Sequence, residues 1–298
     1  DKELIIFMPG LGGDIGNFRW LGYELSRLGW PVLFVDHEGS NSKAFIAAIK
    51  GEESIPGGAE FFLYRLKDLE TVIKAHENGF FEIKNNSYIL MGHSLGALTA
   101  FLYEGSLPKS GFESRCKDAL NDFALTNLSK LIQCQLSEIK LPIFQKSNNL
   151  RAIVGLNSFG SLIWPSPKSS GIESPVLLIG GTYDLITPLI SEQFQVFLST
   201  SSNSLNRFLV VEGARHFSPI KVPKNKSDRF NGDDVFKIND SFIGENPDFV
   251  QDLALKIIIE FLVGLDKREG IEVVKKQTYK KLNFHIFDKE GVKEILRN

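Results

Sequence analysis

The chain is 298 residues long, 43% of them hydrophobic, and its 34 basic and 36 acidic side chains give a formal net charge of −2. This length allows one large core, so we expect a single domain over residues 1–298. The balanced charge provides no general attraction to nucleic acid or to anionic lipid, and the chain contains no run of about 18 apolar residues that would indicate an integral membrane segment.

The N-terminus leaves the cellular location open. A signal peptide has a basic stretch followed by an apolar one, and that pattern is not present. The chain begins at Asp1 rather than at a methionine. Two alternatives therefore stand: a cytoplasmic protein, or a periplasmic or secreted protein from which a leader has been removed.

The cysteines and histidines argue against a metal enzyme. Cys116 and Cys134 are the only two cysteines, and the five histidines are scattered along the chain without ligand spacing. Two interpretations of the cysteines stay open. They are either free thiols packed as small hydrophobic side chains or one local disulfide, which would indicate an oxidising compartment.

Apolar segments of strand length alternate with amphipathic segments of helical length. The apolar segments are hydrophobic almost throughout, as strands buried on both faces of a parallel sheet are. This alternation predicts a doubly wound, mostly parallel α/β sheet, with functional groups at the carboxyl ends of the strands. The expected strands cover residues 4–9, 31–37, 88–93, 152–157, 175–181 and 207–213, and the expected helices cover residues 17–28, 59–78, 95–104, 189–198 and 247–265.

Three segments interrupt the alternation. Residues 105–149 are too long for a plain connection and have leucines and isoleucines at helical spacing, which predicts a helical cap insertion over the edge of the sheet. Residues 221–245 are polar and indicate a loop. Residues 266–298 form a charged C-terminal extension that we expect to pack only in part.

The sequence "GHSLG" at residues 92–96 matches the pattern G-x-S-x-G. An expected strand ends at His93 and an expected helix begins after Ser94, which is the structural context that gives this pattern its meaning. Such a turn holds the serine in a strained conformation with its hydroxyl exposed, and Gly92 and Gly96 remove the clashes that larger residues would cause. We therefore predict that Ser94 is a nucleophile.

A serine hydroxyl needs a base to take its proton, and the base needs a carboxylate to orient it. His216 follows the last expected strand, and Asp184 lies in the turn after the strand before it. The order Ser94, Asp184, His216 predicts a catalytic triad. Glu212 and Glu173 are alternative candidates for its acidic member.

An acyl-transfer site also needs two donors directed at the developing negative charge. The backbone N–H of Leu95, next to the nucleophile, is the first candidate. Leu11 supplies the second, in the glycine-rich loop after the first expected strand. That loop has neither of the glycine patterns of nucleotide-binding loops, so we do not expect it to bind a nucleotide.

The segments "PGLGG", "GHSLG", "GGTYD" and "GARHF" occur in this order and resemble the α/β-hydrolase family over about residues 3–265. More narrowly, "DHEGSNSKAF", the cysteine-bearing insertion and "ARHFSPI" resemble bacterial proteins, many of them cyanobacterial, that are labelled predicted dienelactone hydrolases and are akin to platelet-activating-factor acetylhydrolases. Dienelactone hydrolases themselves use a cysteine nucleophile, whereas here the turn holds Ser94. The resemblance implies ester hydrolysis through an acyl-enzyme without a cofactor. It places Ser94, Asp184 and His216 in the triad, and Leu11 and Leu95 in the oxyanion hole.

The expected function is therefore that of an esterase-like or lipase-like serine hydrolase acting on a small-molecule or lipid-like carboxylic ester. The alternatives are a thioesterase or acyltransferase with the same triad, and a non-catalytic binding protein on a hydrolase scaffold. Aromatic candidates for the substrate pocket are Phe18, Trp20, Phe159 and Trp164. The sequence does not indicate an oligomeric state.

Overall fold

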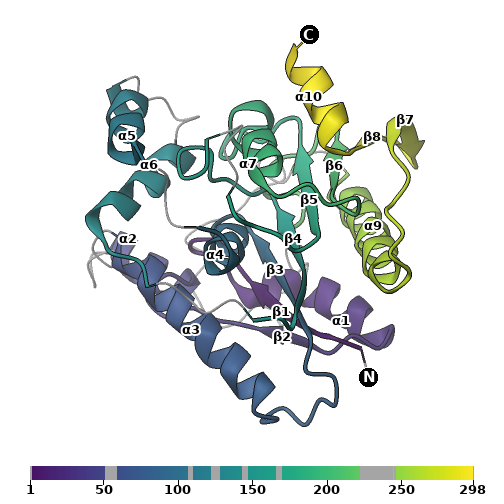
Figure 1. The fold of residues 1–298 in the computed structure, drawn as a ribbon, viewed down its shortest axis with the longest axis horizontal. Helices are drawn as coiled ribbons and strands as arrows, with labels where there is room; N and C mark the ends of the chain where they lie inside the picture. The colour runs from purple at the N-terminus through teal and green to yellow at the C-terminus, as the bar shows by residue number, and fades with distance from the viewer. Residues whose placement is uncertain are drawn as a thin grey trace.

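The structure is a computed structural model that describes residues 2–50, 59–106, 110–121, 128–142, 147–165, 170–221, 244 and 246–297. Its centre is one sheet in the strand order β2-β1-β3-β4-β5-β6-β8-β7 (Figure 1). Neighbouring strands from β2 to β6 are parallel, and β8 pairs antiparallel with both β6 and β7. The strands are β1 (Leu4–Met8), β2 (Val32–Phe34), β3 (Tyr88–His93), β4 (Leu150–Leu156), β5 (Val176–Gly181), β6 (Arg207–Val211), β7 (Val274–Tyr279) and β8 (Leu282–Phe287).

The predicted doubly wound sheet is confirmed, because helices cover both of its faces. Side chains alternate between the faces, so Ile5 and Phe7 of β1 belong to one core cluster and Leu4, Ile6 and Met8 to the other. The helices of the first cluster are α1 (Arg19–Arg27) and α9 (Pro247–Lys267). Those of the second are α3 (Glu60–Glu77), α4 (Leu95–Glu104), α7 (Phe194–Ser199) and α10 (Lys289–Arg297).

Helix α4 lies at the centre of the second face (Figure 1). All ten of its residues are buried, as expected for a helix that is apolar on every side. The sequence predicted its bounds correctly. Helix α3 is amphipathic instead, and its Phe62, Leu66, Leu69 and Ile73 follow helical spacing and are buried.

Three further elements follow strands or lead into the helices already described. The 3-10 helix η1 (Ile15–Phe18) leads into α1, and the π-helix η4 (Leu189–Gln193) leads into α7. Helix α2 (Ser42–Lys50) follows β2, where the sequence predicted no helix. The described part of the chain contains no helix that is long and apolar enough to cross a membrane.

The insertion contains α5 (Phe112–Asn121), α6 (Leu128–Cys134) and the 3-10 helix η3 (Gln135–Glu138), at the side of the sheet beyond α4 (Figure 1). A disulfide joins Cys116 of α5 to Cys134 of α6. Of the two interpretations of these cysteines, the structure therefore has the local disulfide, the one associated with an oxidising compartment.

One buried carboxylate attaches this cap to the body of the protein. Glu192 of η4 is fully buried, and its two oxygens accept hydrogen bonds from both sides. The donors from the cap are Ser129 Oγ at 2.9 Å and Gln133 Nε2 at 3.1 Å, and those from the loop after β4 are the backbone N–H groups of Gly160 at 3.2 Å and Ser161 at 3.1 Å. Each of these bonds is charge-assisted, so the attachment is strong.

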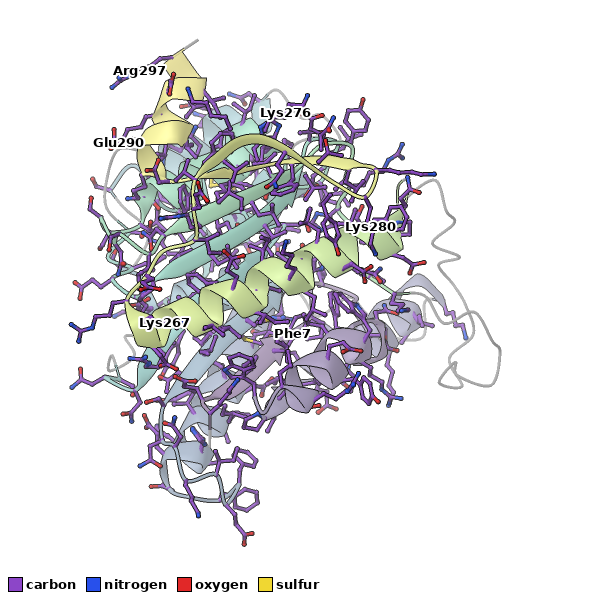
Figure 2. All side chains as sticks on the ribbon, turned by 90° about the vertical axis from the view of Figure 1, so that its right-hand side faces the viewer. Phe7, Lys267, Lys276, Lys280, Glu290 and Arg297 are labelled. Carbon is purple, nitrogen blue, oxygen red and sulfur yellow. A yellow bond between two sulfur atoms is a disulfide. The ribbon has the colours of Figure 1, made fainter. Side chains whose placement is uncertain are left out.

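The C-terminal extension adds β7 and β8 to the sheet, which the sequence did not predict. Figure 2 shows this hairpin beside α9, with Lys276 and Lys280 labelled near it. Strand β8 has the alternating burial of a strand with one covered face, while the four central residues of β7 are exposed. Of the polar segment 221–245, only Lys221 and Gly244 lie within the described residues.

Candidate active site

Ser94 occupies the sharp turn between β3 and α4. Its φ of 52° and ψ of −118° lie outside the regions that residues with a side chain normally adopt. A Cβ atom at Gly92 would lie 2.3 Å from the carbonyl carbon of Gly96, and one at Gly96 would lie 1.8 Å from Met8 O. Both positions require glycine, as the sequence pattern predicted, and the turn projects Ser94 beyond the end of the sheet.

Asp184 and His216 meet at the carboxyl ends of β5 and β6. The distances from His216 Nδ1 to the two carboxylate oxygens of Asp184 are 3.1 and 3.0 Å, and both side chains are buried. A carboxylate only accepts hydrogen bonds, so Nδ1 donates to Asp184 and Nε2 is the nitrogen that does not contact it. The imidazole is therefore arranged as a general base.

Five further donor groups from four residues hold the Asp184 carboxylate, and none of these residues was predicted from the sequence. The donors are Asn157 Nδ2 at 2.8 Å, Thr187 Oγ1 at 2.6 Å, Thr187 N at 2.8 Å, Ile186 N at 3.0 Å and Gln193 Nε2 at 3.2 Å. Burial alone would raise the pKa of Asp184, but the charge of His216 and the hydrogen bonds from His216 and Thr187 outweigh burial and lower the pKa below its usual value. Asp184 is therefore an anion at neutral pH.

His93, the residue before Ser94, connects the turn to the loop of His216. Its Nε2 donates to the backbone oxygen of His216 at 2.9 Å, and the two imidazole rings are 4.9 Å apart. Burial and the neighbouring His216 lower the pKa of His93 to about 3, so His93 is neutral. His93 thus connects the turn of Ser94 directly to the backbone of His216.

The glycine-rich loop after β1 packs directly against the turn. A Cβ atom at Gly10 would lie 3.1 Å from Ser94 Cβ. Gly12 has a φ of 66° and donates its N–H to Ser40 O at 2.9 Å, which fixes the loop on the other side of Leu11. Within the described residues, no atom accepts a hydrogen bond from the N–H of Leu11 or of Leu95. Leu11 is 37% exposed, whereas Leu95 is buried at the first position of α4.

The other candidates lie elsewhere. Glu212 Oε1 binds His285 Nε2 at 2.8 Å, and Glu173 borders a cavity at the amino ends of the strands. Phe18, Phe159 and Trp164 are at most 1% exposed and pack in the core, and Trp20 is half-buried with its indole N–H donating to Pro219 O at 3.2 Å. The role of these four aromatic residues in a substrate pocket stays a prediction.

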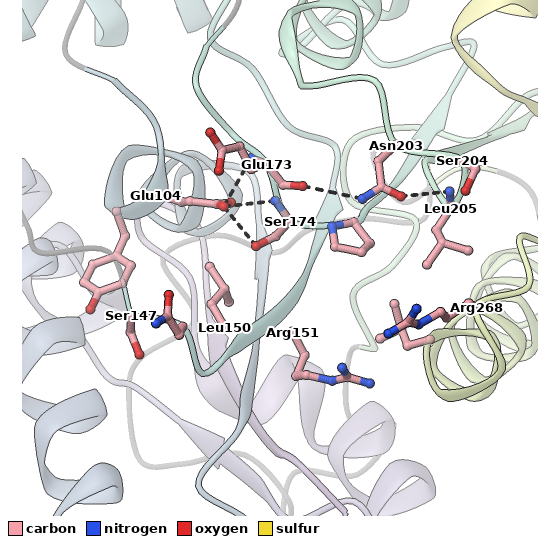
Figure 3. A pocket seen from close by; sticks show the side chains of 14 residues that line it. Glu104, Ser147, Leu150, Arg151, Glu173, Ser174, Asn203, Ser204, Leu205 and Arg268 are labelled. Carbon is pink, nitrogen blue, oxygen red and sulfur yellow. Dashed lines mark hydrogen bonds between the residues drawn. The ribbon is translucent and has the colours of Figure 1, made fainter.

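A cavity of about 560 Å³ does not adjoin Ser94. It opens at the amino ends of β4 and β5, on the opposite edge of the sheet (Figure 3). There Glu104 accepts hydrogen bonds from Glu173 and Ser174, and Arg151 and Arg268 lie on the other side. No histidine or cysteine lines this cavity, so it has no pair of nucleophile and base. The carboxyl edge, where open α/β sheets usually bind their ligands, is therefore the candidate site.

Residues 1–112 match the family model described as serine aminopeptidase, S33. This segment contains the glycine-rich loop, β3, the turn at Ser94 and α4, and it ends before Asp184 and His216. The match and the mostly parallel eight-stranded sheet show that the chain has the α/β-hydrolase fold, of the serine hydrolase type. Comparison with curated proteins gave no match. Within the described residues, no cluster of three or more His, Cys, Asp or Glu could hold a metal ion.

Proposed function

We propose that this protein is a serine hydrolase that cleaves carboxylic esters through Ser94, His216 and Asp184. The observation that carries the proposal is the buried, hydrogen-bonded pair of His216 and Asp184, which His93 connects to the strained turn of Ser94. Burying a carboxylate carries a desolvation cost, which the surrounding donors offset, and the position of Asp184 beside His216 supports a role in orienting a base.

The reaction follows from the protonation states. Ser94 Oγ attacks the ester carbonyl while His216 Nε2 takes the hydroxyl proton, and Asp184 stabilises the imidazolium that forms. The tetrahedral intermediate expels the alcohol, which receives the proton from His216. Water then attacks the acyl-enzyme, with His216 again acting as the base, and releases the carboxylic acid and free Ser94.

The negative charge on the intermediate needs donors that are fixed in advance. The N–H groups of Leu11 and Leu95 lie on the two segments that meet at Ser94, and both lack an acceptor within the described residues. The N-terminus of α4 adds the positive end of its dipole on the same side. We assign these two N–H groups to the oxyanion hole.

The surroundings favour an apolar acyl group. Large apolar side chains are exposed on the loops next to the site: Leu11 at 37%, Tyr183 at 62% and Leu185 at 68%, the last two on either side of Asp184. The resemblance to platelet-activating-factor acetylhydrolases and to the dienelactone hydrolase group points to esters as well. The substrate class is thus a small-molecule or lipid-like ester.

The family description gives a second candidate, an aminopeptidase. The same triad would attack a peptide carbonyl, but an aminopeptidase also needs an anionic group to bind the free amino terminus of its substrate. The buried carboxylates of Asp184 and Glu192 are both occupied by donors of this chain. A thioesterase or acyltransferase would use the same residues, whereas a non-catalytic binding protein would leave Ser94 unreactive.

A panel of substrates separates these functions. We expect p-nitrophenyl esters, from acetate to palmitate, to be hydrolysed with a preference for one chain length, and the Ser94→Ala variant to be inactive. Aminoacyl p-nitroanilides, acyl thioesters and added amine acceptors test the alternatives under the same conditions. If no ester is hydrolysed and a fluorophosphonate fails to label Ser94, the proposed function is wrong.

A further inference from the structure

Arg65, on α3, is buried behind the loop that carries Leu11. Its side chain is 1% exposed, and its guanidinium donates to three segments. Nη2 donates to Pro9 O after β1, Nη1 to Ser40 Oγ after β2 at 3.0 Å, and Nε to Thr99 Oγ1 of α4 at 3.1 Å. The planar fork of an arginine is suited to holding several acceptors in a fixed arrangement.

Each of these three acceptors is a chain neighbour or a hydrogen-bond partner of a segment that carries a proposed oxyanion donor. The carbonyl of Pro9 belongs to the peptide directly before the one that carries the Leu11 N–H. The backbone oxygen of Ser40 accepts a hydrogen bond from the N–H of Gly12 at 2.9 Å. Pro9 and Gly12, the residues on either side of the Gly10–Leu11 segment, are therefore both fixed. Thr99 Oγ1 donates to Leu95 O at 2.7 Å. A single side chain therefore fixes the segments of both donors.

The charge of Arg65 has no direct counter-ion. Its three acceptors are neutral, and no carboxylate within the described residues forms an ion pair with it. Asp68, one turn further along α3, is bound instead to His37 at 2.9 Å. Burial lowers the pKa of Arg65 to about 9, so the guanidinium is still charged at neutral pH. The charges of Asp68 and Asp36 stabilise the guanidinium only in part, because burial outweighs them. A charge buried at this cost supports a role beyond packing.

We propose that Arg65 is the positioning residue of the oxyanion hole: it fixes the Leu11 and Leu95 segments and places a buried positive charge behind the position where the oxyanion forms. This inference rests on the proposed function. Arg65 touches no reacting atom, and it acts through the two loops that it holds. In a site of low dielectric, such a fixed charge lowers the energy of the negatively charged intermediate more than that of the neutral substrate.

The test compares variants in ester hydrolysis at saturating and at low substrate. Arg65→Met removes the fork and the charge, and Arg65→Lys keeps the charge alone. We expect kcat to fall roughly 10- to 100-fold in Arg65→Met and less in Arg65→Lys, with KM within about twofold of the parent. Inhibition by a trifluoromethyl ketone, which forms an oxyanion on Ser94, is expected to weaken by the same factor as kcat/KM.

A matched control separates this role from stability. Arg207 is a partly buried arginine at the amino end of β6, and it donates to the backbone oxygens of Ser204, Asn206 and Ile271. Arg207→Met is expected to lower the melting temperature and to leave kcat per folded molecule unchanged. If Arg65→Met does not fold, Ser40→Ala and Thr99→Val each remove one acceptor of the guanidinium, and each is expected to lower kcat several-fold.

The outcomes distinguish the two proposals. If the parent is active and fluorophosphonate labels Ser94, but kcat and ketone affinity are unchanged in the folded Arg65 variants, or in both acceptor variants, the role of Arg65 is disproved and the proposed function stands. Equal losses of kcat in Arg65→Met and Arg207→Met would also overturn it. If the parent hydrolyses no ester and is not labelled, both proposals fail.

Discussion

At the residue scale, the site consists of a few reactive groups and a larger number of groups that hold them. Asp184 shows this most clearly, because five donors from the loop after β4, the turn after β5 and η4 surround it in addition to His216. Each donor stabilises the anion and restricts the carboxylate to one orientation. The direction of the His216 ring is therefore set by the body of the protein.

The first prediction at this scale concerns the acidic member. An Asp184→Asn substitution keeps the shape but removes the charge and favours the wrong tautomer of His216, so we expect kcat to fall by roughly 10³-fold or more. The matched change Glu212→Gln, at the carboxylate that binds His285, is expected to leave kcat unchanged. Steady-state hydrolysis of the preferred p-nitrophenyl ester measures both, and a larger loss in Glu212→Gln would reverse the assignment.

The second prediction concerns His93. His93→Phe keeps a ring next to Phe18 but removes the donor to the backbone oxygen of His216. We expect the rate of Ser94 labelling by fluorophosphonate to fall roughly 10-fold, because a base displaced by even a fraction of an ångström is less effective. His93→Gln retains a donor and is expected to recover part of the rate. Equal labelling rates in His93→Phe and His93→Gln would show that the packing of this side chain, and not its hydrogen bond, determines the rate.

At the element scale, two separate contacts attach the cap to the body of the protein. Glu192 binds α6 to the loop after β4, and Arg115 of α5 donates to Leu162 O in that loop at 2.9 Å. The disulfide then joins α5 to α6. Helices α5 and α6 therefore form one unit, which is held in a fixed position beside the carboxyl edge of the sheet.

The prediction at this scale is that the disulfide stabilises the cap and not the sheet. A link across a sequence separation of 18 residues contributes about 3 kcal/mol in the chain-entropy account. We expect the Cys116→Ser and Cys134→Ser double variant, or reduction of the parent, to accelerate hydrogen exchange in α5 and α6 while α4 and α9 keep their protection. Uniform acceleration in all four helices would contradict this expectation.

At the scale of the whole molecule, two buried histidines make stability depend on pH. Burial and Arg65 lower the pKa of His37 to about 4, and burial and His216 lower that of His93 to about 3. In the unfolded chain both histidines bind a proton near pH 6.5. Between about pH 6.5 and pH 4, the unfolded state therefore holds more protons than the folded state, and acid favours unfolding.

We accordingly expect the free energy of unfolding to decrease as the pH falls through this window, by up to about 1.4 kcal/mol per pH unit for each of the two histidines. Urea unfolding at pH 7, 6, 5 and 4.5 measures the slope. In a His93→Asn variant, this slope is expected to be smaller by about the contribution of one histidine. A stability that is independent of pH between 7 and 4.5 would contradict the neutral state of both rings.

The central fold could be predicted from the sequence because its strands are buried on both faces and its helices have clear apolar periodicity. The hairpin of β7 and β8 could not, since "VKKQTY" is mostly polar and joins the sheet only through β8, which in turn pairs with β6. The turn of Ser94 follows from its glycines. Asn157, Thr187 and Gln193 are common polar residues whose approach to Asp184 depends on tertiary structure, and Arg65 resembles any helical arginine until its burial is known.

The same hairpin has a consequence for association between molecules. Without it, β6 would be an open edge of four buried apolar residues, which is a template for pairing with another chain. Strand β8 covers this edge, and β7 presents exposed Lys275 and Lys276 and an irregular register between Val274 and Gln277 to the solvent. Charge and a bulge of this kind discourage further strand addition. A chain that ends after α9 should therefore aggregate, even though the residues that form the candidate site would all be present.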